Sequence, residues 1–280
     1  MLKIDQKLFF GLLLVFLTKL GVSGYFLSFT SLSLLSLGLC GIWLYFGKET
    51  PFRNKLKLFF PPLSVPVVYN ATGKIVSRLQ LPKIDLLLQR ADQWFFGESL
   101  SLKMCAWIHP LFTEIMYLVY LLFFYYILSS LIHYVKRNDH LTRSFYSGLF
   151  SIYWIGFIFY MITPGEGPHF STPELFGPPL KEGILFSASI HKMLYEGMNG
   201  TGAFPSLHCS LSAFCLLFDW THRRRRFYPG AIYCTLVWIS TIYLRYHYFV
   251  DFLSGMALTL FALYLAKRSL DTDMKPLRRR

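Results

Sequence analysis

Long apolar runs recur along this sequence from one end to the other. A helix needs roughly 20 apolar residues to cross a hydrocarbon core of about 30 Å, and a soluble core would not repeat runs of that length. The composition agrees, since 54% of the residues are hydrophobic and only 15% are charged. We therefore predict an all-α fold, a polytopic membrane helical bundle of about six or seven spans. The predicted spans are Leu8–Leu27, Leu32–Phe46, Pro110–Tyr134, Phe145–Ile162, Ser206–Trp220, Tyr228–Leu244 and Val250–Ala266.

The region before residue 105 is less regular. Its first apolar run contains Lys19 and three glycines, so it is the weakest span. The run lacks a small-residue cleavage site and is followed closely by another, which indicates a retained anchor rather than a removed signal peptide. Between Gly47 and Met104 a proline-rich stretch precedes an amphipathic one over Lys83–Phe96, and this predicts helices lying on the membrane surface.

These patterns divide the chain into three parts. We expect N-terminal spans and interfacial amphipathic helices over residues 1–104, a catalytic transmembrane bundle over residues 105–268, and a basic cytoplasmic tail over residues 269–280.

The formal net charge of +13 comes from short basic stretches between or after the apolar runs. Examples are Lys136 with Arg137, the run Arg223–Arg226 and the tail Arg278–Arg280. The positive-inside rule accounts for this placement better than nucleic-acid binding does, so we expect no nucleic-acid partner. With Arg223–Arg226 in the cytoplasm, His208 and His247 both fall on the non-cytoplasmic side. The N-terminal third does not fit this alternation, because the basic stretch Lys48–Lys57 prefers the cytoplasm whereas Pro110 needs an external start.

Two segments bring ionisable groups to the ends of spans, where each such group calls for an explanation. In the first, Gly202-Ala-Phe-Pro-Ser-Leu-His208, Pro205 and Ser206 suit the opening turn of a helix and His208 lies one turn inside it. Free backbone N–H groups at that opening, together with the Ser206 hydroxyl, favour an anion such as phosphate.

The second segment is Arg245-Tyr-His-Tyr-Phe-Val-Asp251, which puts His247 and Asp251 on one helical face. A carboxylate bonded to one imidazole nitrogen leaves the other as an oriented nucleophile or base. His208 is then a candidate acid for the leaving oxygen, and Arg245 is a candidate to neutralise a phosphoryl group. The plainer alternative is a helix-end histidine and a structural ion pair.

Both segments resemble signatures of the type 2 phosphatidic acid phosphatase superfamily. Pro205-Ser-Leu-His208 matches its Pro-Ser-x-His signature, and His247 and Asp251 match the His-x-x-x-Asp end of the next one. The stretch His247-Tyr-Phe-Val-Asp251 also resembles the branch that contains inositol phosphorylceramide synthases and sphingomyelin synthases. The resemblance implies a double displacement in which His247 attacks phosphorus, Asp251 supports it and His208 protonates the leaving group. It also implies that neither a metal ion nor another cofactor takes part.

Two departures from the superfamily pattern stand out. Its arginine, which precedes the histidine by six positions, is replaced by Thr241, and Arg245 is the candidate substitute. The first signature is absent, and Thr163-Pro-Gly-Glu-Gly-Pro-His169 stands in its place. His169 is a candidate phosphate-binding residue there, although a plain turn at a helix exit explains the same pattern.

The sequence therefore predicts an integral, multi-pass membrane enzyme with its active site on the non-cytoplasmic face. The expected substrate is a lipid phosphate or phospholipid, and water or a lipid hydroxyl is the acceptor, so that hydrolase and phosphotransferase both stay open. A membrane transporter with an ionisable substrate path is the alternative from a different class. We expect Asp85, Asp92 and Glu98 to be solvated caps, and Glu114 to bond a neighbouring helix.

Overall fold

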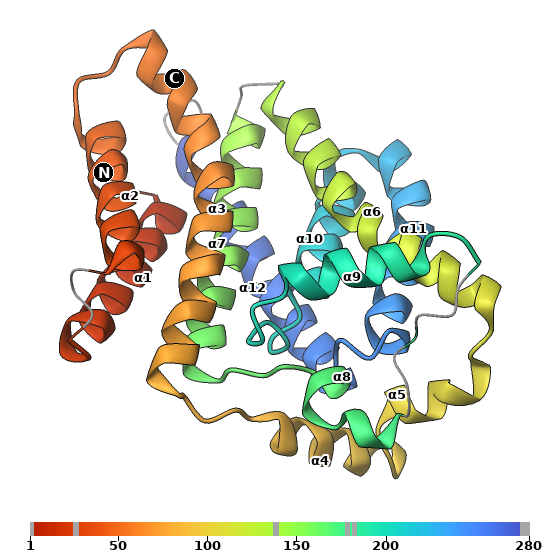
Figure 1. Ribbon diagram of the computed structural model, residues 1–280. Helices are drawn as coiled ribbons and strands as arrows, with labels where there is room; N and C mark the ends of the chain where they lie inside the picture. Colours follow the sequence, from red (N-terminus) through yellow and green to blue (C-terminus); the bar gives the residue numbers. More distant parts are fainter. Residues whose placement is uncertain (1–2, 25–27, 137–139, 177–179, 181–183, 275–280) are drawn as a thin grey trace.

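The computed structural model describes residues 3–24, 28–136, 140–176, 180 and 184–274, and its regular elements there are helices (Figure 1). The all-α prediction is therefore confirmed. The elements are α1 (Ile4–Val22), α2 (Phe29–Phe46), α3 (Pro51–Leu79), α4 (Asp85–Phe96), α5 (Leu100–Lys103), η1 (Met104–Trp107), α6 (Pro110–Val135), α7 (His140–Ile162), α8 (Pro168–Ser171), η2 (Pro173–Leu175), α9 (Ser187–Gly197), α10 (Leu207–His222), α11 (Arg224–Tyr243) and α12 (Phe249–Met274).

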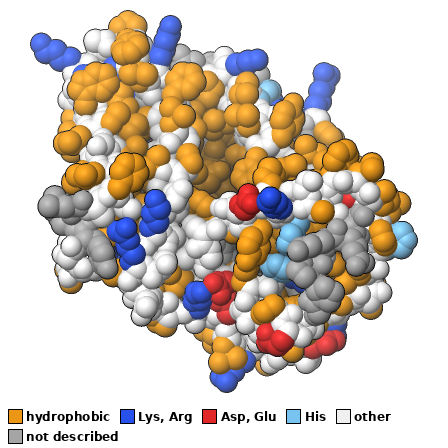
Figure 2. Space-filling model, viewed as in Figure 1, with side chains coloured by type: hydrophobic (Ala, Val, Ile, Leu, Met, Phe, Trp, Pro, Cys, Tyr) orange, Lys and Arg blue, Asp and Glu red, His pale blue; other side chains and the backbone are white. Residues whose placement is uncertain are grey.

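Each predicted span corresponds to a helix. Among the described residues, α2, α6, α7 and α12 are long and apolar enough to cross a membrane, and the other three spans correspond to α1, α10 and α11. Hydrophobic side chains cover the upper part of the molecule in Figure 2, with Lys and Arg along its upper rim. This is the surface of an integral membrane protein. Leu27, Arg137 and the tail Arg278–Arg280 lie outside the described residues.

Helix α7 is the centre of the bundle. It packs against α1, α3, α10 and α12, and one core cluster of buried side chains joins all of these helices. Gly148 permits the close approach of two neighbours, because a Cβ atom there would lie 2.4 Å from the Phe214 ring and 3.0 Å from the Ala262 carbonyl oxygen. Small residues at helix crossings have this use in membrane bundles.

Helix α3 differs from the prediction for its region. It is one helix of 29 residues that runs alongside α7 (Figure 1), so the expectation of helices lying on the surface is wrong for this part of the chain. The two helices are parallel: Tyr146 of α7 bonds Leu58 of α3, and 11 residues further along each helix the rings of Phe157 and Tyr69 lie 6.1 Å apart.

Three prolines lie inside α3, and the helix continues through them. Pro62 has no N–H to donate to the carbonyl oxygen of Leu58, which would leave that acceptor unpaired. The Tyr146 hydroxyl donates to it instead at 2.9 Å. Neighbouring helices and serine side chains commonly satisfy such freed groups in membrane proteins.

The direction of α3 accounts for the charge pattern that the sequence left open. Helix α3 starts next to the basic stretch Lys48–Lys57 and, like α7, ends at the opposite end of the bundle. The chain is therefore already at this second end when Pro110 begins α6. The basic stretch thus lies at the same end as the start of α7.

Two further helices lie across the bundle rather than along it. Helix α4 runs across the lower end in Figure 1, as its amphipathic pattern predicted, and α9 crosses in front of α10. Glu114 of α6 accepts the backbone N–H groups of residues 184–187 and so fixes the start of α9, a bond to a neighbouring helix as expected. These helices form the polar end of the molecule, where the signature residues lie.

Candidate active site

The two signature segments meet at the end of the bundle where α4 lies. His208 is in the first turn of α10, His247 lies between α11 and α12, and Asp251 is in the first turn of α12. The ring centroids of His208 and His247 are 5.7 Å apart. The structure therefore brings together the three residues that the sequence singled out, and both histidines lie at one end of the bundle.

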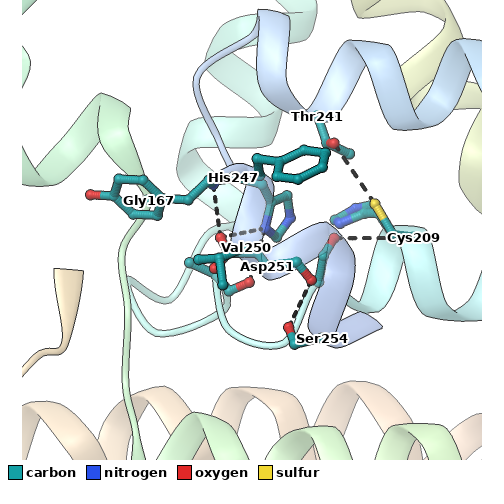
Figure 3. A network of polar contacts seen from close by, with 12 residues as sticks. Gly167, Cys209, Thr241, His247, Val250, Asp251 and Ser254 are labelled. Atoms are coloured by element: carbon teal, nitrogen blue, oxygen red, sulfur yellow. Dashed lines mark hydrogen bonds and ion pairs between the residues drawn. The ribbon is translucent and has the colours of Figure 1, made fainter. Parts of the chain in front are cut away.

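Asp251 orients the imidazole of His247 (Figure 3). The Nδ1 atom of His247 lies 2.9 Å from the Ala203 carbonyl oxygen and 3.3 Å from Asp251 Oδ2. Because a backbone carbonyl only accepts, Nδ1 carries the proton and Nε2 keeps a free lone pair. The carboxylate is itself held by the Tyr248 N–H at 2.9 Å. The imidazole and the carboxylate are both buried, so the geometry is well fixed.

Helices α10 and α12 are locked together beside this pair. The Ser206 hydroxyl accepts the Cys209 N–H and caps α10, and the Ser206 N–H donates to the Asp251 carbonyl oxygen at 3.2 Å. Gly255 makes the contact possible, because a Cβ atom there would lie 2.7 Å from the Ser206 carbonyl oxygen. The position of His208 relative to His247 thus depends on a direct contact between two helix starts.

His208 faces the same cavity as His247. Its ring packs against Tyr120 and Phe123, with ring centroids 4.5 and 4.6 Å away, and its Nδ1 lies 3.4 Å from the Tyr120 hydroxyl. Both histidines line a small cavity of about 50 Å³.

Asp92 is a supporting residue that the sequence interpretation missed. It is fully buried, and its two carboxylate oxygens accept the N–H groups of Phe249 and Val250 at 3.1 Å each. Asp92 therefore caps the helix that carries Asp251, from a position on α4 about 160 residues earlier in the chain. The expectation of a solvated cap is wrong for this residue, because only the folded chain brings α4 under the start of α12.

Asp85 holds the other side of the site in a similar way. Its carboxylate accepts the N–H groups of Glu166 and Gly167 at 2.9 to 3.1 Å and the Tyr248 hydroxyl at 3.3 Å. It is buried, so a solvated role is wrong here too, whereas Glu98 is exposed as expected. Burial raises the pKa of both Asp85 and Asp92, and the backbone N–H groups that they accept oppose this rise.

Arg245 and His169 lie together, but beside the cavity rather than in its lining. The Arg245 guanidinium lies over the Phe176 ring and contacts Cys105, and the Arg245 carbonyl oxygen accepts the His169 N–H at 2.8 Å. The His169 ring is 6.1 Å from Tyr246, which itself packs on Tyr120. Neighbouring rings of Tyr246 and Tyr120 therefore connect His169 with His208.

His191 completes this second, basic cluster and had no signal in the sequence. It is buried on α9, 5.5 Å from His169 between ring centroids, and its Nδ1 lies 2.9 Å from the Tyr117 hydroxyl. Arg245 also has a positive φ of 66°, an unusual backbone conformation for a residue with a side chain. Among the described residues, no group of three or more His, Cys, Asp or Glu side chains is placed to hold a metal ion.

The structure is thus a helical membrane bundle with two histidines and a buried aspartate together at one end. The comparison with protein families agrees: the family model of the PAP2 superfamily matches residues 87–265, and the chain belongs to this superfamily.

Two relatives are similar over different lengths. A PA-phosphatase related-family protein of Dictyostelium discoideum is 28% identical over 250 residues, which cover 76% of this chain and 45% of the relative. An inositol phosphorylceramide synthase of Candida albicans is 43% identical over 60 residues, 21% of this chain and 12% of that protein. The chain spans less than half the length of either relative. No solved structure matches.

Proposed function

We propose that this chain is a membrane lipid phosphotransferase or phosphatase that works through a phosphohistidine on His247. One observation carries the proposal: the imidazole of His247 is fixed by Asp251 through Nδ1, and His208 lies beside it on the same small cavity. A nucleophile oriented by a third group, with an acid within reach, is the arrangement that covalent catalysis needs.

In the first step, Nε2 of His247 attacks phosphorus and the bond between phosphorus and the leaving oxygen breaks. His208 gives its proton to that oxygen, so the leaving group departs as a neutral alcohol. The phosphorylated imidazole is held by its Nδ1–H bonds to Asp251 and the Ala203 carbonyl oxygen. The negative charge of Asp251 stabilises the imidazole as it loses electron density to phosphorus.

In the second step, a hydroxyl group attacks the phosphohistidine. His208, now neutral, accepts the proton of that hydroxyl, and His247 leaves as a neutral imidazole. With water as the acceptor the products are those of a phosphatase, and with a lipid hydroxyl the reaction is a transfer. His208 thus donates a proton in the first step and accepts one in the second, while His247 carries the phosphoryl group between them.

Ser206, Arg245 and His169 are the proposed phosphate-binding residues. Ser206 caps α10, and the first N–H groups of a helix favour an anion beside His208. Arg245 and His169 are not among the residues that line the cavity, so we assign them to attracting the anionic substrate rather than to direct contact with phosphorus.

We favour transfer over hydrolysis. The His-Tyr-x-x-Asp form at His247 and the local similarity to the Candida albicans synthase both support this choice. Purified protein incubated with labelled phospholipid, with and without ceramide or diacylglycerol, separates the two reactions. Transfer puts the label in a new lipid, whereas hydrolysis releases it only as a soluble product.

We further propose that the active site lies on the non-cytoplasmic face. The basic stretches Lys48–Lys57 and Arg223–Arg226 lie at the starts of α3 and α11, at the end of the bundle away from His208. The positive-inside rule assigns that end to the cytoplasm. A membrane-impermeant lipid analogue added to oriented vesicles tests this assignment.

His247→Ala is the test of the proposed function, and we expect it to abolish turnover of phospholipid and lipid phosphate. The control is His222→Ala, which makes the same change at the opposite end of α10 and should keep activity. Turnover by the His247→Ala protein would rule out the mechanism. The transporter alternative instead predicts lipid or ion movement that depends on His247 without any cleaved phosphoester bond.

A further inference from the structure

A cavity at the basic end of the bundle has no part in the mechanism above. It has a volume of about 540 Å³, and its lining comes from the starts of α1, α3 and α7 and from the end of α2. Helices α1 and α3 pack against α7, and α2 packs against both α1 and α3 (Figure 1). Pockets of about 300 to 1,000 Å³ commonly hold small organic ligands. We call this space the basic-end cavity.

The lining of the basic-end cavity carries charges of both signs. Of the described residues that line it, Lys3, Lys57 and Arg143 are basic, and Asp5 and Glu49 are acidic. The ammonium of Lys57 lies 3.5 Å from the carboxylate of Glu49. A ligand with charge of one sign would be attracted by part of this lining and repelled by the rest. A ligand that carries both a cation and an anion can meet an opposite charge with each.

Asp5 is the buried carboxylate of this lining. The residue is 6% exposed, and its Oδ1 atom has no hydrogen-bond partner among the described residues. Asp5 lies in the first turn of α1, where the helix dipole favours the charged form of a carboxylate. A buried charged oxygen without a partner costs free energy, and an N–H donor bound in the cavity would remove that cost.

The helix starts favour an anion in the same cavity. Helices α1, α3 and α7 all begin there, so that the positive ends of three helix dipoles lie around it. Lys3 precedes α1 directly, and Arg143 is in the first turn of α7, so two basic side chains are attached at these positive ends. A phosphate group is therefore favoured beside the donor that Asp5 requires.

The end of α2 indicates the level of the membrane at which the cavity lies. Trp43 and Phe46 are exposed there, and Tyr45 and Phe46 line the cavity itself. Aromatic side chains collect where a span meets the lipid heads, and the basic stretch Lys48–Lys57 follows directly. The cavity is thus at the depth of the phospholipid heads of the adjacent leaflet, and such a lipid is the ligand that reaches it most directly.

We infer that the basic-end cavity binds the head of a phospholipid with a primary ammonium group, as in phosphatidylethanolamine, and holds it without converting it. The ammonium donates to Oδ1 of Asp5, and the phosphate lies at the helix starts beside Lys3 and Arg143. A choline head has the same charges but no N–H to donate, so the cavity discriminates between the two heads. The site lies at the opposite end of the bundle from His247 and does not depend on the proposed function.

Binding to the full chain in detergent is measured by native mass spectrometry, which counts bound lipids one by one. The ligands are short-chain phosphatidylethanolamine, phosphatidylcholine and phosphatidylglycerol, together with soluble phosphoethanolamine. Asp5→Asn should weaken the binding of one phosphatidylethanolamine molecule about tenfold, the usual effect of losing a charged hydrogen bond. Phosphatidylcholine binding should change less than twofold, because its head has no N–H for Asp5. A lipid bound at the catalytic end is the same in both proteins.

Two further variants separate the parts of the site. Asp271→Asn makes the same change at an exposed position and is the matched control. Arg143→Gln should weaken phosphatidylethanolamine and phosphatidylcholine alike, by several-fold, because both lipids carry the phosphate. Without added lipid, the Asp5→Asn protein should unfold at the same temperature as wild type or a higher one, since a buried unpaired charge has been removed.

Unchanged phosphatidylethanolamine binding in the Asp5→Asn protein, or an equal loss for phosphatidylcholine, would overturn the inference. A lower unfolding temperature of that protein would also overturn it, because Asp5 would then have its partner within the chain. Phosphatidylglycerol that binds more tightly than phosphatidylethanolamine would indicate a simple anion site. Soluble phosphoethanolamine that binds as tightly as the lipid would assign the cavity to a soluble ligand instead.

Discussion

Two buried aspartates lie at opposite ends of the bundle, and their surroundings differ. At the basic end, Asp219 of α10 accepts the Tyr134 hydroxyl at 2.5 Å and the Arg226 guanidinium at 3.2 Å, and the same guanidinium donates to Ser130. At the other end, Asp251 Oδ2 lies 3.3 Å from Nδ1 of His247, and the His247 ring lines the catalytic cavity. Both carboxylates are at most 1% exposed.

The comparison teaches that burial of charge does not by itself indicate an active site. A guanidinium stays protonated at any pH that a protein meets, so the Asp219 network is a fixed ion pair that joins α6, α10 and α11. An imidazole nitrogen can accept a proton and give it up again in the course of a reaction. The His247 and His208 pair can therefore change state during a reaction, whereas the Asp219 network can only hold the helices together.

The largest effect among the predictions below is expected at His208. His208→Ala should lower kcat for an alkyl phosphate lipid by about 10² to 10⁴, the usual contribution of a general acid. The loss should be much smaller with p-nitrophenyl phosphate, because p-nitrophenolate leaves without a proton. Rates with the two substrates check this, and an equal loss for both would contradict the acid role.

Asp251→Asn comes next. The neutral amide keeps the size of the side chain but removes the negative charge beside His247 Nδ1, so we expect kcat to fall about 10- to 100-fold. Asp271→Asn makes the same change at an exposed position of the same helix and is the control. Unchanged kcat in the Asp251→Asn protein would show that Asp251 has only a structural role, as Asp219 does.

A smaller effect is expected at Asp92. Asparagine has one accepting oxygen, so Asp92→Asn loses one of the two bonds that cap α12. A helix cap contributes about 1 kcal/mol, and kcat should fall about threefold to tenfold as the start of α12 shifts. The exposed Glu98→Gln is the control. A kcat equal to that of wild type would show that α4 does not position the site.

The smallest effect on turnover is expected at the basic end. Tyr134→Phe removes one donor to Asp219 and should lower the free energy of unfolding by about 1 to 3 kcal/mol, with kcat per folded protein unchanged. Thermal unfolding in detergent and the rate at saturating substrate measure the two quantities. A lower kcat with unchanged unfolding would break the distinction between the two ends.

The sequence predicted the helices and the signature residues because both depend on local patterns. Apolar runs show up in composition, and His208, His247 and Asp251 lie in short motifs. Helix α3 was not predicted as part of the bundle, because the pattern of its region indicated helices on the membrane surface. The bond from Tyr146 of α7 to Leu58 joins residues distant in the chain, so the sequence does not show it. The roles of Asp92 and His191 were also missed, since their partners are distant in the chain.

Phosphohistidine trapping is the most direct test of the central claim. The protein is mixed with lipid carrying a labelled phosphate, quenched in base within one turnover, digested and sequenced by mass spectrometry. The proposed mechanism predicts a base-stable, acid-labile phosphoryl group or phosphoryl headgroup on His247, absent from the His247→Ala protein. Label on another residue, or full turnover in a protein that never carries label on His247, would contradict it.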